Sequence, residues 1–428
     1  MPDTPHLLLP RGFRYAAVKA GLKKSGRTDF ALIVADTPAS AAAVFTSNKV
    51  IAAPLIIDKQ HLAATAGHIR LAIINAGNAN CAVGQLGLAA AIATCNAAAQ
   101  TFNCKPEEVF PSSTGIIGVP LPAEKLIAAL PEAAAALGSE IDHFQNVANA
   151  ILTTDTLEKT AFARFEISGP PAIPAATTSS ASTPDPGPQT PDPRPEIRIA
   201  GLAKGSGMIH PQLVPHATML VYILTDADLS PAHLQHYLNQ SIEVSFNRIS
   251  VDGDTSTNDT VLLLASGASG ATFGPNNAAF ATALTQVCTS LAHQVVADGE
   301  GITHVVELRI HGASTDADAL KIAKAIAHSP LVKTAWAGND PNWGRLVAAI
   351  GYSGAAIDPN RIDIRFGDLP ICLNGGRAPQ FDESAAHEYI QQPEFSITIE
   401  LHQGSGACVF FTTDLTHEYI HINADYSS

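Results

Sequence analysis

The sequence predicts an α/β protein in which mixed β-sheets are flanked by helices. Short apolar segments typical of strands, such as "FALIVAD" and "IRLAIINAG", alternate with long alanine-rich segments typical of helices. The chain has 428 residues, of which 46% are hydrophobic and 15% are charged, as in globular proteins. This length predicts two domains or one large, subdivided α/β body.

The first half of the chain contains strands, helices and one long insertion. Strands are expected over residues 30–36 and 69–77, and helices over "LGLAAAIATCNAAAQTF" and "PAEKLIAALPEAAAALG". Nine prolines fall within residues 170–196, too many for a helix or a sheet ladder, so we expect a disordered surface loop there. The alternating segments on either side, "TAFARFEI" and "EIRIAGLA", predict an antiparallel hairpin that carries this loop.

The second half continues the α/β pattern. "MLVYIL" and "HVVELRIHG" are expected as strands, and "FATALTQVCTSLAHQVVADGEG" as a helix that ends in a turn. "DADALKIAKAIAHSPLVKTAWAG" is expected as one further helix, and "EYIHI" near the end as a strand-like segment. No repeat of 20 to 50 residues is visible.

Charge and cysteine usage exclude several function classes. The 39 acidic and 25 basic residues give a formal charge of -14, which repels nucleic acids and anionic membranes, so neither is expected as a partner. No apolar run reaches membrane-spanning length and no secretory signal is visible, so we expect a cytoplasmic protein. The six cysteines are scattered and expected to be reduced, and the 16 histidines form no ligand motif, so no metal is expected.

Thr218 in "PHATML" is a candidate nucleophile, although it also suits a strand that enters the core. A free threonine hydroxyl needs a base, and cleavage of the chain before Thr218 would supply one as the new α-amine. The reference pKa of such an amine is roughly 7.7 to 8.0, near neutral pH. Ala217 is a small residue suited to the other side of that cut.

Three other segments contain candidate site residues, each with a plainer alternative. In "PSSTGIIG", expected as a turn before a helix, Thr114 and Gly115 suit an oxyanion hole but also a helix cap. Glu300, between glycines in "VADGEGITH", suits a ligand amine but also a solvated turn. The closing "HINADYSS" contains Asn423 and Ser428, in a position where frayed tails are common.

Together these segments resemble the ornithine acetyltransferase family, the ArgJ-type glutamate N-acetyltransferases of arginine biosynthesis. The resemblance covers nearly the whole chain, because the family's motifs occur in order: "ASAAAVFTSNKV", "INAGNANCAVG", "PSSTGIIG", "TTDT", "AKGSGMIHP", "ATML", "FNRISVDGDTSTNDT", "VADGEGIT", "KTAWAGNDPNWGR" and "INADYSS". It implies a self-processing, threonine-nucleophile architecture. Two fragments, residues 1–217 and 218–428, would stay associated as a pair of heterodimers.

The resemblance also implies a reaction and a set of site residues. Acetyl would pass from N-acetylornithine to glutamate through acetyl-Thr218, with Thr114 and Gly115 holding the oxyanion and no cofactor required. Substrate contacts carried over from the family fall on Thr153, Lys204, Thr218, Glu300, Asn423 and Ser428. The segments "NDPNWG" and "DGDTSTND" are expected as turns that shape the site.

Two features depart from the family pattern, and three rival functions remain. "VPH" looks inserted before the cut, which bears on self-cleavage and on the placement of Lys204, and the proline-rich loop is atypical. One rival is a bifunctional enzyme that also takes acetyl from acetyl-CoA. The others are a threonine-nucleophile aminopeptidase, in which water replaces glutamate, and an uncut protein that serves as a binding module.

Overall fold

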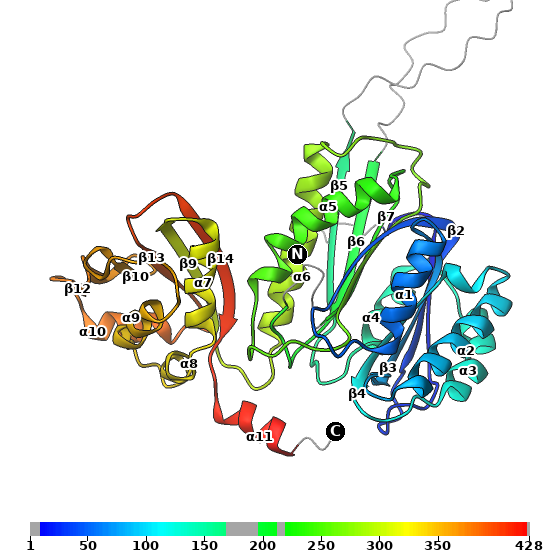
Figure 1. Ribbon diagram of the computed structural model, residues 1–428, viewed down its shortest axis with the longest axis horizontal. Helices are drawn as coiled ribbons and strands as arrows, with labels where there is room; N and C mark the ends of the chain where they lie inside the picture. The colour runs from blue at the N-terminus through cyan, green and yellow to red at the C-terminus, as the bar shows by residue number, and fades with distance from the viewer. Residues whose placement is uncertain (1–8, 168–195, 212–218, 426–428) are drawn as a thin grey trace, which may run out of the picture.

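The computed structural model describes residues 9–167, 196–211 and 219–425. These residues form a large and a small unit, each built on one sheet and lying side by side in Figure 1. The loop predicted for residues 170–196 lies outside the described residues except for Glu196, which begins a strand. The predicted fold class of mixed sheets flanked by helices is confirmed.

The large unit contains an eight-stranded sheet with the order β4-β3-β2-β8-β7-β6-β5, and β1 pairs with β2. The β3–β4 and β7–β8 pairs are parallel and the other pairs are antiparallel. Its strands are β1 (Phe13–Val18), β2 (Phe30–Phe45), β3 (His68–Asn78), β4 (Val109–Ile116), β5 (Lys159–Glu166), β6 (Glu196–Lys204), β7 (Leu220–Thr225) and β8 (Thr260–Ala265).

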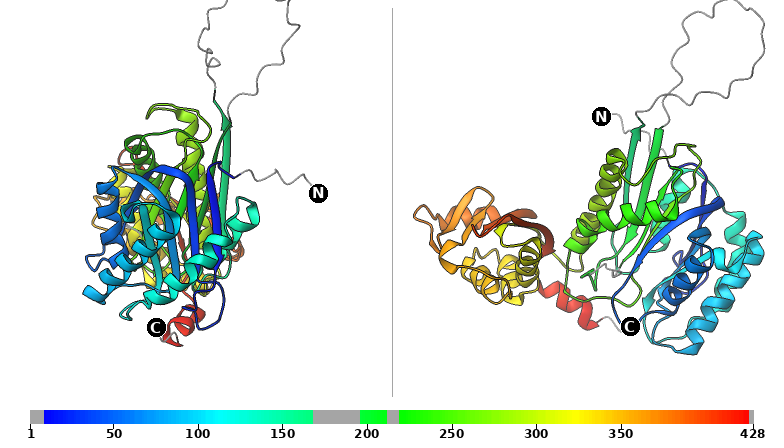
Figure 2. Two further views of the ribbon diagram at one scale, coloured as in Figure 1. Left: turned by 90° about the vertical axis from the view of Figure 1, so that its right-hand side faces the viewer. Right: turned by 45° about the horizontal axis from the view of Figure 1, so that its top comes forward.

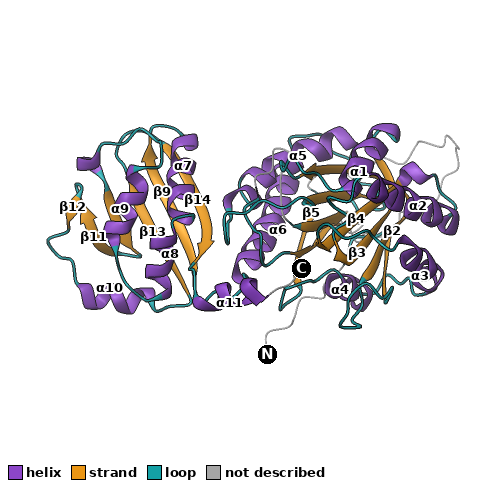
Figure 3. Ribbon diagram, turned by 60° about the horizontal axis from the view of Figure 1, so that its bottom comes forward, coloured by secondary structure: helices purple, strands orange, loops and turns teal. Residues whose placement is uncertain are grey.

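Helices cover both faces of this sheet because its central strands are apolar on both sides (Figure 3). In β7, Val221 and Ile223 pack in a core cluster with α5 and α6, whereas Tyr222 and Leu224 pack in a second cluster with Phe144 of α4. The helices of this unit are α1 (Ala53–Ala64), α2 (Gln85–Phe102), α3 (Ala123–Ala135), α4 (Ile141–Ala150), α5 (Pro231–Glu243) and α6 (Ala278–Ala297).

The small unit has a six-stranded sheet with the order β12-β11-β10-β13-β9-β14 and its own apolar core. Its strands are β9 (Val305–Ala313), β10 (Asp363–Phe366), β11 (Leu369–Leu373), β12 (Gly376–Arg377), β13 (Glu394–Glu400) and β14 (Gly406–Thr413). Its helices are α7 (Asp316–Ala327), α8 (Pro330–Ala337), α9 (Trp343–Gly351) and α10 (Glu383–Ile390). After β14 the chain leaves this unit as α11 (His417–Asp425), which lies between the two units in Figure 1 and in the right-hand view of Figure 2.

The order of strands in the large sheet does not follow the chain. β8 and β7, which come after residue 218, lie between β2 and β6, which come before it. Six residue pairs join β7 to β6, and six join β8 to β2. The predicted hairpin is confirmed, since β5 and β6 pair from Lys159 opposite Ala203 to Glu166 opposite Glu196.

Three predicted elements were wrong. Residues 316–338 form two helices, because Pro330 cannot continue a helix and instead begins α8. "EYIHI" lies in α11, where the Tyr419 N–H donates to Thr416 Oγ1 (3.2 Å) as at a helix start. "PSSTG" is not a turn but the end of β4, an edge strand that tolerates Pro111.

Candidate active site

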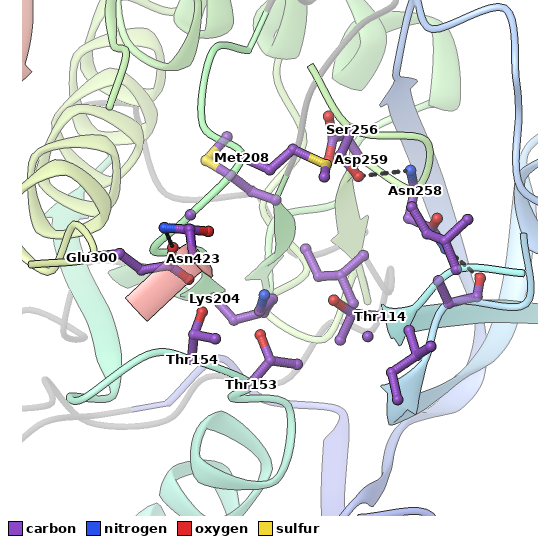
Figure 4. Close-up of a pocket in the computed structure, with 17 residues that line it drawn as sticks. Thr114, Thr153, Thr154, Lys204, Met208, Ser256, Asn258, Asp259, Glu300 and Asn423 are labelled. Atoms are coloured by element: carbon purple, nitrogen blue, oxygen red, sulfur yellow. Dashed lines mark hydrogen bonds between the residues drawn. The ribbon is translucent and has the colours of Figure 1, made fainter. Parts of the chain in front are cut away.

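A cavity of about 320 Å³ opens beside the ends of β4 and β6 and the start of β7 (Figure 4). Residues from both sides of position 218 line it, so the cavity depends on both halves of the chain. The lining consists of Ala79, Thr114, Gly115, Ile116, Ile117, Thr153, Thr154, Lys204, Gly207, Met208, Met219, Leu220, Ser256, Asn258, Asp259, Glu300 and Asn423.

Thr114 and Gly115 form one wall of this cavity at the end of β4. Gly115 has φ +129°, and a Cβ there would lie 2.4 Å from the carbonyl carbon of Gly77 on β3. Only glycine permits this approach of the two strands. The half-buried Thr114 and the Gly115 backbone therefore meet the cavity at a fixed position, as an oxyanion hole requires.

Asn258, two residues before β8, fixes this wall. Its buried side-chain amide donates to the carbonyl oxygens of Ala79 (2.5 Å) and Ser113 (2.8 Å), and its Oδ1 accepts from Thr257 Oγ1 (2.6 Å). One amide therefore ties the ends of β3 and β4 to β8. It thereby holds Ser113, the residue that precedes Thr114.

Lys204, the last residue of β6, provides a buried cation in the cavity. Its Nζ lies 3.7 Å from Asp155 Oδ2, and Asp155 also accepts from the backbone N–H groups of Gly205 (2.6 Å) and Thr153 (3.0 Å). Burial alone would raise the pKa of Asp155, but the charges of Lys204 and Lys159 outweigh it and hold this pKa well below the usual range. Asp155 is therefore an anion that positions both Thr153 and Lys204.

Glu300 provides a largely buried carboxylate in the same cavity. Its Oε2 accepts from Asn423 Nδ2 of α11 (3.0 Å), and its backbone N–H donates to the Ser206 carbonyl (3.2 Å). A Cβ at Gly207 would lie 2.3 Å from the same Oε2, so the backbone packs directly against the carboxylate. Glu300 is thus held from two sides, with Asn423 beside it in Figure 4.

α11 reaches this cavity because the backbone of Gly301 lets it come close. Gly301 has φ +64°, and a Cβ there would lie 2.4 Å from the backbone nitrogen of Tyr419. The Thr416 hydroxyl also donates to the Gly301 carbonyl. These contacts bring Asn423 from the small unit to Glu300 on the large one.

Six residues predicted for the site line this one cavity: Thr114, Gly115, Thr153, Lys204, Glu300 and Asn423. Ala217, Thr218 and Ser428 lie outside the described residues, and Met219, the residue after Thr218, lines the cavity. Their roles in catalysis and binding stay predictions. Asp155 and Asn258 were missed as individual residues, although both stand in quoted motifs, "TTDT" and "DGDTSTND".

Within residues 9–167, 196–211 and 219–425, no group of His, Cys, Asp or Glu side chains is arranged to hold a metal ion. In the same part of the chain, no helix combines the length and the apolar character needed to cross a membrane. All six cysteines are free thiols, as predicted.

The ArgJ family model matches residues 14–181 and 188–428. The chain belongs to the ArgJ family. The arginine biosynthesis bifunctional protein ArgJ of Geobacter sulfurreducens is 41% identical over 420 residues, which cover 97% of this chain and 99% of that protein. Its counterpart from Ruegeria pomeroyi is 42% identical over 424 residues, or 99% of this chain and 96% of that protein. The resemblance inferred from the sequence is confirmed.

Two solved structures are also similar. ArgJ from Bacillus halodurans shares 41% sequence identity with a TM-score of 0.46, over 47% of this chain and 96% of that one. Ornithine acetyltransferase from Mycobacterium tuberculosis, complexed with ornithine, shares 30% identity with a TM-score of 0.37, over 49% of this chain and 94% of that one.

Proposed function

We propose that this ArgJ-family protein is an acyltransferase of arginine biosynthesis that moves acetyl from N-acetylornithine to glutamate. Its relatives carry the name arginine biosynthesis bifunctional protein ArgJ, and one similar structure is of an ornithine acetyltransferase complexed with ornithine. In this proposal the chain cleaves itself between Ala217 and Thr218. Residues 1–217 and 218–428 then act together.

The observation that carries the proposal is the arrangement of charge around the Thr114 and Gly115 wall. The same cavity contains a cation, Lys204, and a carboxylate, Glu300. An acetylated diamino acid has a carboxylate for the first, an ammonium for the second and an acetyl carbonyl for the wall. Thr153, Asn423 and Ser428 complete the proposed substrate contacts.

The mechanism has two half-reactions through one covalent intermediate. The Thr218 Oγ attacks the acetyl carbon while the new α-amine takes the hydroxyl proton, and the negative oxygen is held by Thr114 and Gly115. The C–N bond breaks, the amine returns the proton to the leaving nitrogen, and ornithine departs from acetyl-Thr218. The glutamate amine then attacks the ester carbonyl, the C–O bond breaks, and Thr218 regains its proton.

The interleaved strands support the association of the two proposed fragments. Because β7 and β8 lie between β2 and β6, backbone hydrogen bonds would join the pieces on two borders after the cut. We further propose a pair of such heterodimers in the cytoplasm. Since the relatives are named bifunctional, acetyl-CoA is proposed as a second acetyl donor.

A denaturing gel and mass spectrometry test the proposal. We expect two bands from the matured protein, one band from Thr218→Ala, and an acetyl mass on the fragment that begins at Thr218 after incubation with N-acetylornithine. Continued release of ornithine over many turnovers that does not respond to glutamate would instead identify a hydrolase. An uncut and inactive wild-type protein would favour the binding module.

A further inference from the structure

A second cavity, also of about 320 Å³, adjoins the first. The two cavities share four wall residues, Gly115, Ile116, Thr153 and Thr154. The rest of the second cavity is formed by Gly77 and by the loop between β1 and β2, with Leu22, Lys23, Lys24, Ser25 and Arg27. The loop therefore lies across these shared residues from the first cavity.

The loop brings three cations to the second cavity, and hydrogen bonds hold its backbone in place. The carboxylate of Asp29 accepts the backbone N–H groups of Ala20 (2.6 Å), Leu22 (2.5 Å) and Lys23 (2.8 Å), so it shapes the loop. Within the described residues, no ion pair involves Lys24 or Arg27. In a chain with a formal charge of -14, this cavity is locally positive.

Lys23 is the innermost of the three cations. Its Nζ donates to the carbonyl oxygens of Thr28 (2.8 Å) and Ala150 (2.7 Å), which leaves one ammonium hydrogen for another acceptor. It is half-buried and close enough to Lys204 and Asp155 to interact with their charges. Burial, followed by the charge of Arg27, lowers the pKa of Lys23 to about 8, so the side chain is mostly protonated at neutral pH.

The proposed reaction needs such a cation because its two substrates end in opposite charges. The α-nitrogen that loses acetyl in the first half-reaction and the one that gains it in the second must occupy the same place. With the α-nitrogen fixed there, the side chain of ornithine ends in an ammonium, whereas the side chain of glutamate ends in a carboxylate. Glu300 attracts the ammonium and repels the carboxylate, so the acceptor needs a second direction in which to place its side chain.

We propose that the second cavity binds the side-chain carboxylate of glutamate, with Lys23 in contact and Lys24 and Arg27 adding positive field. The inference rests on the proposed function and assigns separate subsites to the two substrates. Ornithine uses the cavity that contains Glu300, and glutamate uses the one beside the 22–27 loop. The two subsites meet at the four shared residues, so one glutamate can reach from the acetyl group into the second cavity.

Charge removal at the exposed positions tests this assignment and keeps the Asp29 hydrogen bonds that shape the loop. In Lys24→Gln/Arg27→Gln we expect the KM for glutamate to rise about threefold to tenfold, more at low salt. Single-turnover release of ornithine from N-acetylornithine should change less than twofold. The matched control, Lys105→Gln/Arg361→Gln, removes two exposed charges that line neither cavity. It should change neither quantity.

Lys23→Met is the stronger variant, with an expected rise of more than tenfold in the KM for glutamate. Thermal unfolding checks that it folds, because Lys23 also holds two carbonyls. If the double variant releases ornithine normally and its KM for glutamate is unchanged, the inference is overturned but the proposed function is not. Absence of ornithine release from the wild type overturns the proposed function, and the inference falls with it.

Measuring the KM for acetyl-CoA as well distinguishes a glutamate carboxylate from the phosphate groups of acetyl-CoA as the anion that binds in the second cavity. If the double variant raises the KM for acetyl-CoA but not for glutamate, the cavity binds phosphate groups and the assignment to glutamate is overturned. If only glutamate is affected, the assignment stands.

Discussion

Replacement of Asn258 by aspartate tests whether the Thr114 and Gly115 wall is held from behind. The change keeps the size of the side chain but replaces its amide donor with an oxygen. That oxygen would face the carbonyls of Ala79 and Ser113, which now accept at 2.5 and 2.8 Å. At 5% exposure the site offers little water to replace the lost donor.

The expected cost follows from these two contacts. Leaving two buried carbonyls without a donor costs roughly 1 kcal/mol or more each, so we expect a loss of about 2 to 4 kcal/mol. At about 2 °C for each kcal/mol in a unit of this size, Tm should fall by at least about 4 °C. A displaced wall should also lower the rate of ornithine release by about tenfold or more, because misplacement near the chemistry is costly.

Differential scanning calorimetry and single-turnover ornithine release measure the two effects. Asn276→Asp is the matched control, since Asn276 is exposed and the same exchange there should leave both within error. A fall in Tm below 2 °C together with a release rate within twofold of the wild type would show that Asn258 does not hold the wall.

Three further predictions concern the other walls. Glu300→Gln should raise the KM for N-acetylornithine about tenfold in steady-state assays, because the charged partner proposed for the ammonium is lost. Asp155, whose folded-state pKa is lowered, contributes stability that is complete above its unfolded pKa of about 3.9 and is lost as pH falls through the folded value. Urea unfolding of Asp155→Asn should therefore show a flatter loss of stability in acid than the wild type, and equal slopes would contradict this. Gly301→Ala should push Tyr419 and α11 away and lower kcat/KM about tenfold, with a Tm shift below 3 °C; unchanged kcat/KM would show that α11 is not needed.

The local sequence pattern correctly predicted those helices and strands for which the local preference and the tertiary packing favour the same structure. The alanine-rich run of α2 and the alternating strands β5 and β6 were found because composition and periodicity both favoured them. The prediction of a strand-like segment at "EYIHI" was wrong. This segment alternates like a strand, but a capping hydroxyl at Thr416 and docking against Gly301 make it a helix.

The site was predictable only in part, for a related reason. Thr114, Lys204 and Glu300 stand in motifs that could be quoted from the sequence, and one cavity brings them together. Asp155 and Asn258 act through hydrogen bonds to backbone groups far away in the chain, such as Gly205 and Ala79. Which backbone group a buried amide or carboxylate will meet depends on the packed fold, so no local pattern indicates it.

The insertion of β7 and β8 between β2 and β6 has a consequence for how the cleaved protein would recover from denaturation. An intact chain refolds in a first-order process, but two severed polypeptides must first collide, and each lacks the neighbours its central strands need. Renaturation yield should then depend on dilution, whereas the uncut Thr218→Ala chain should recover equally well at any concentration that avoids aggregation. Maturation would thereby make recovery of the fold depend on the concentration of the two fragments.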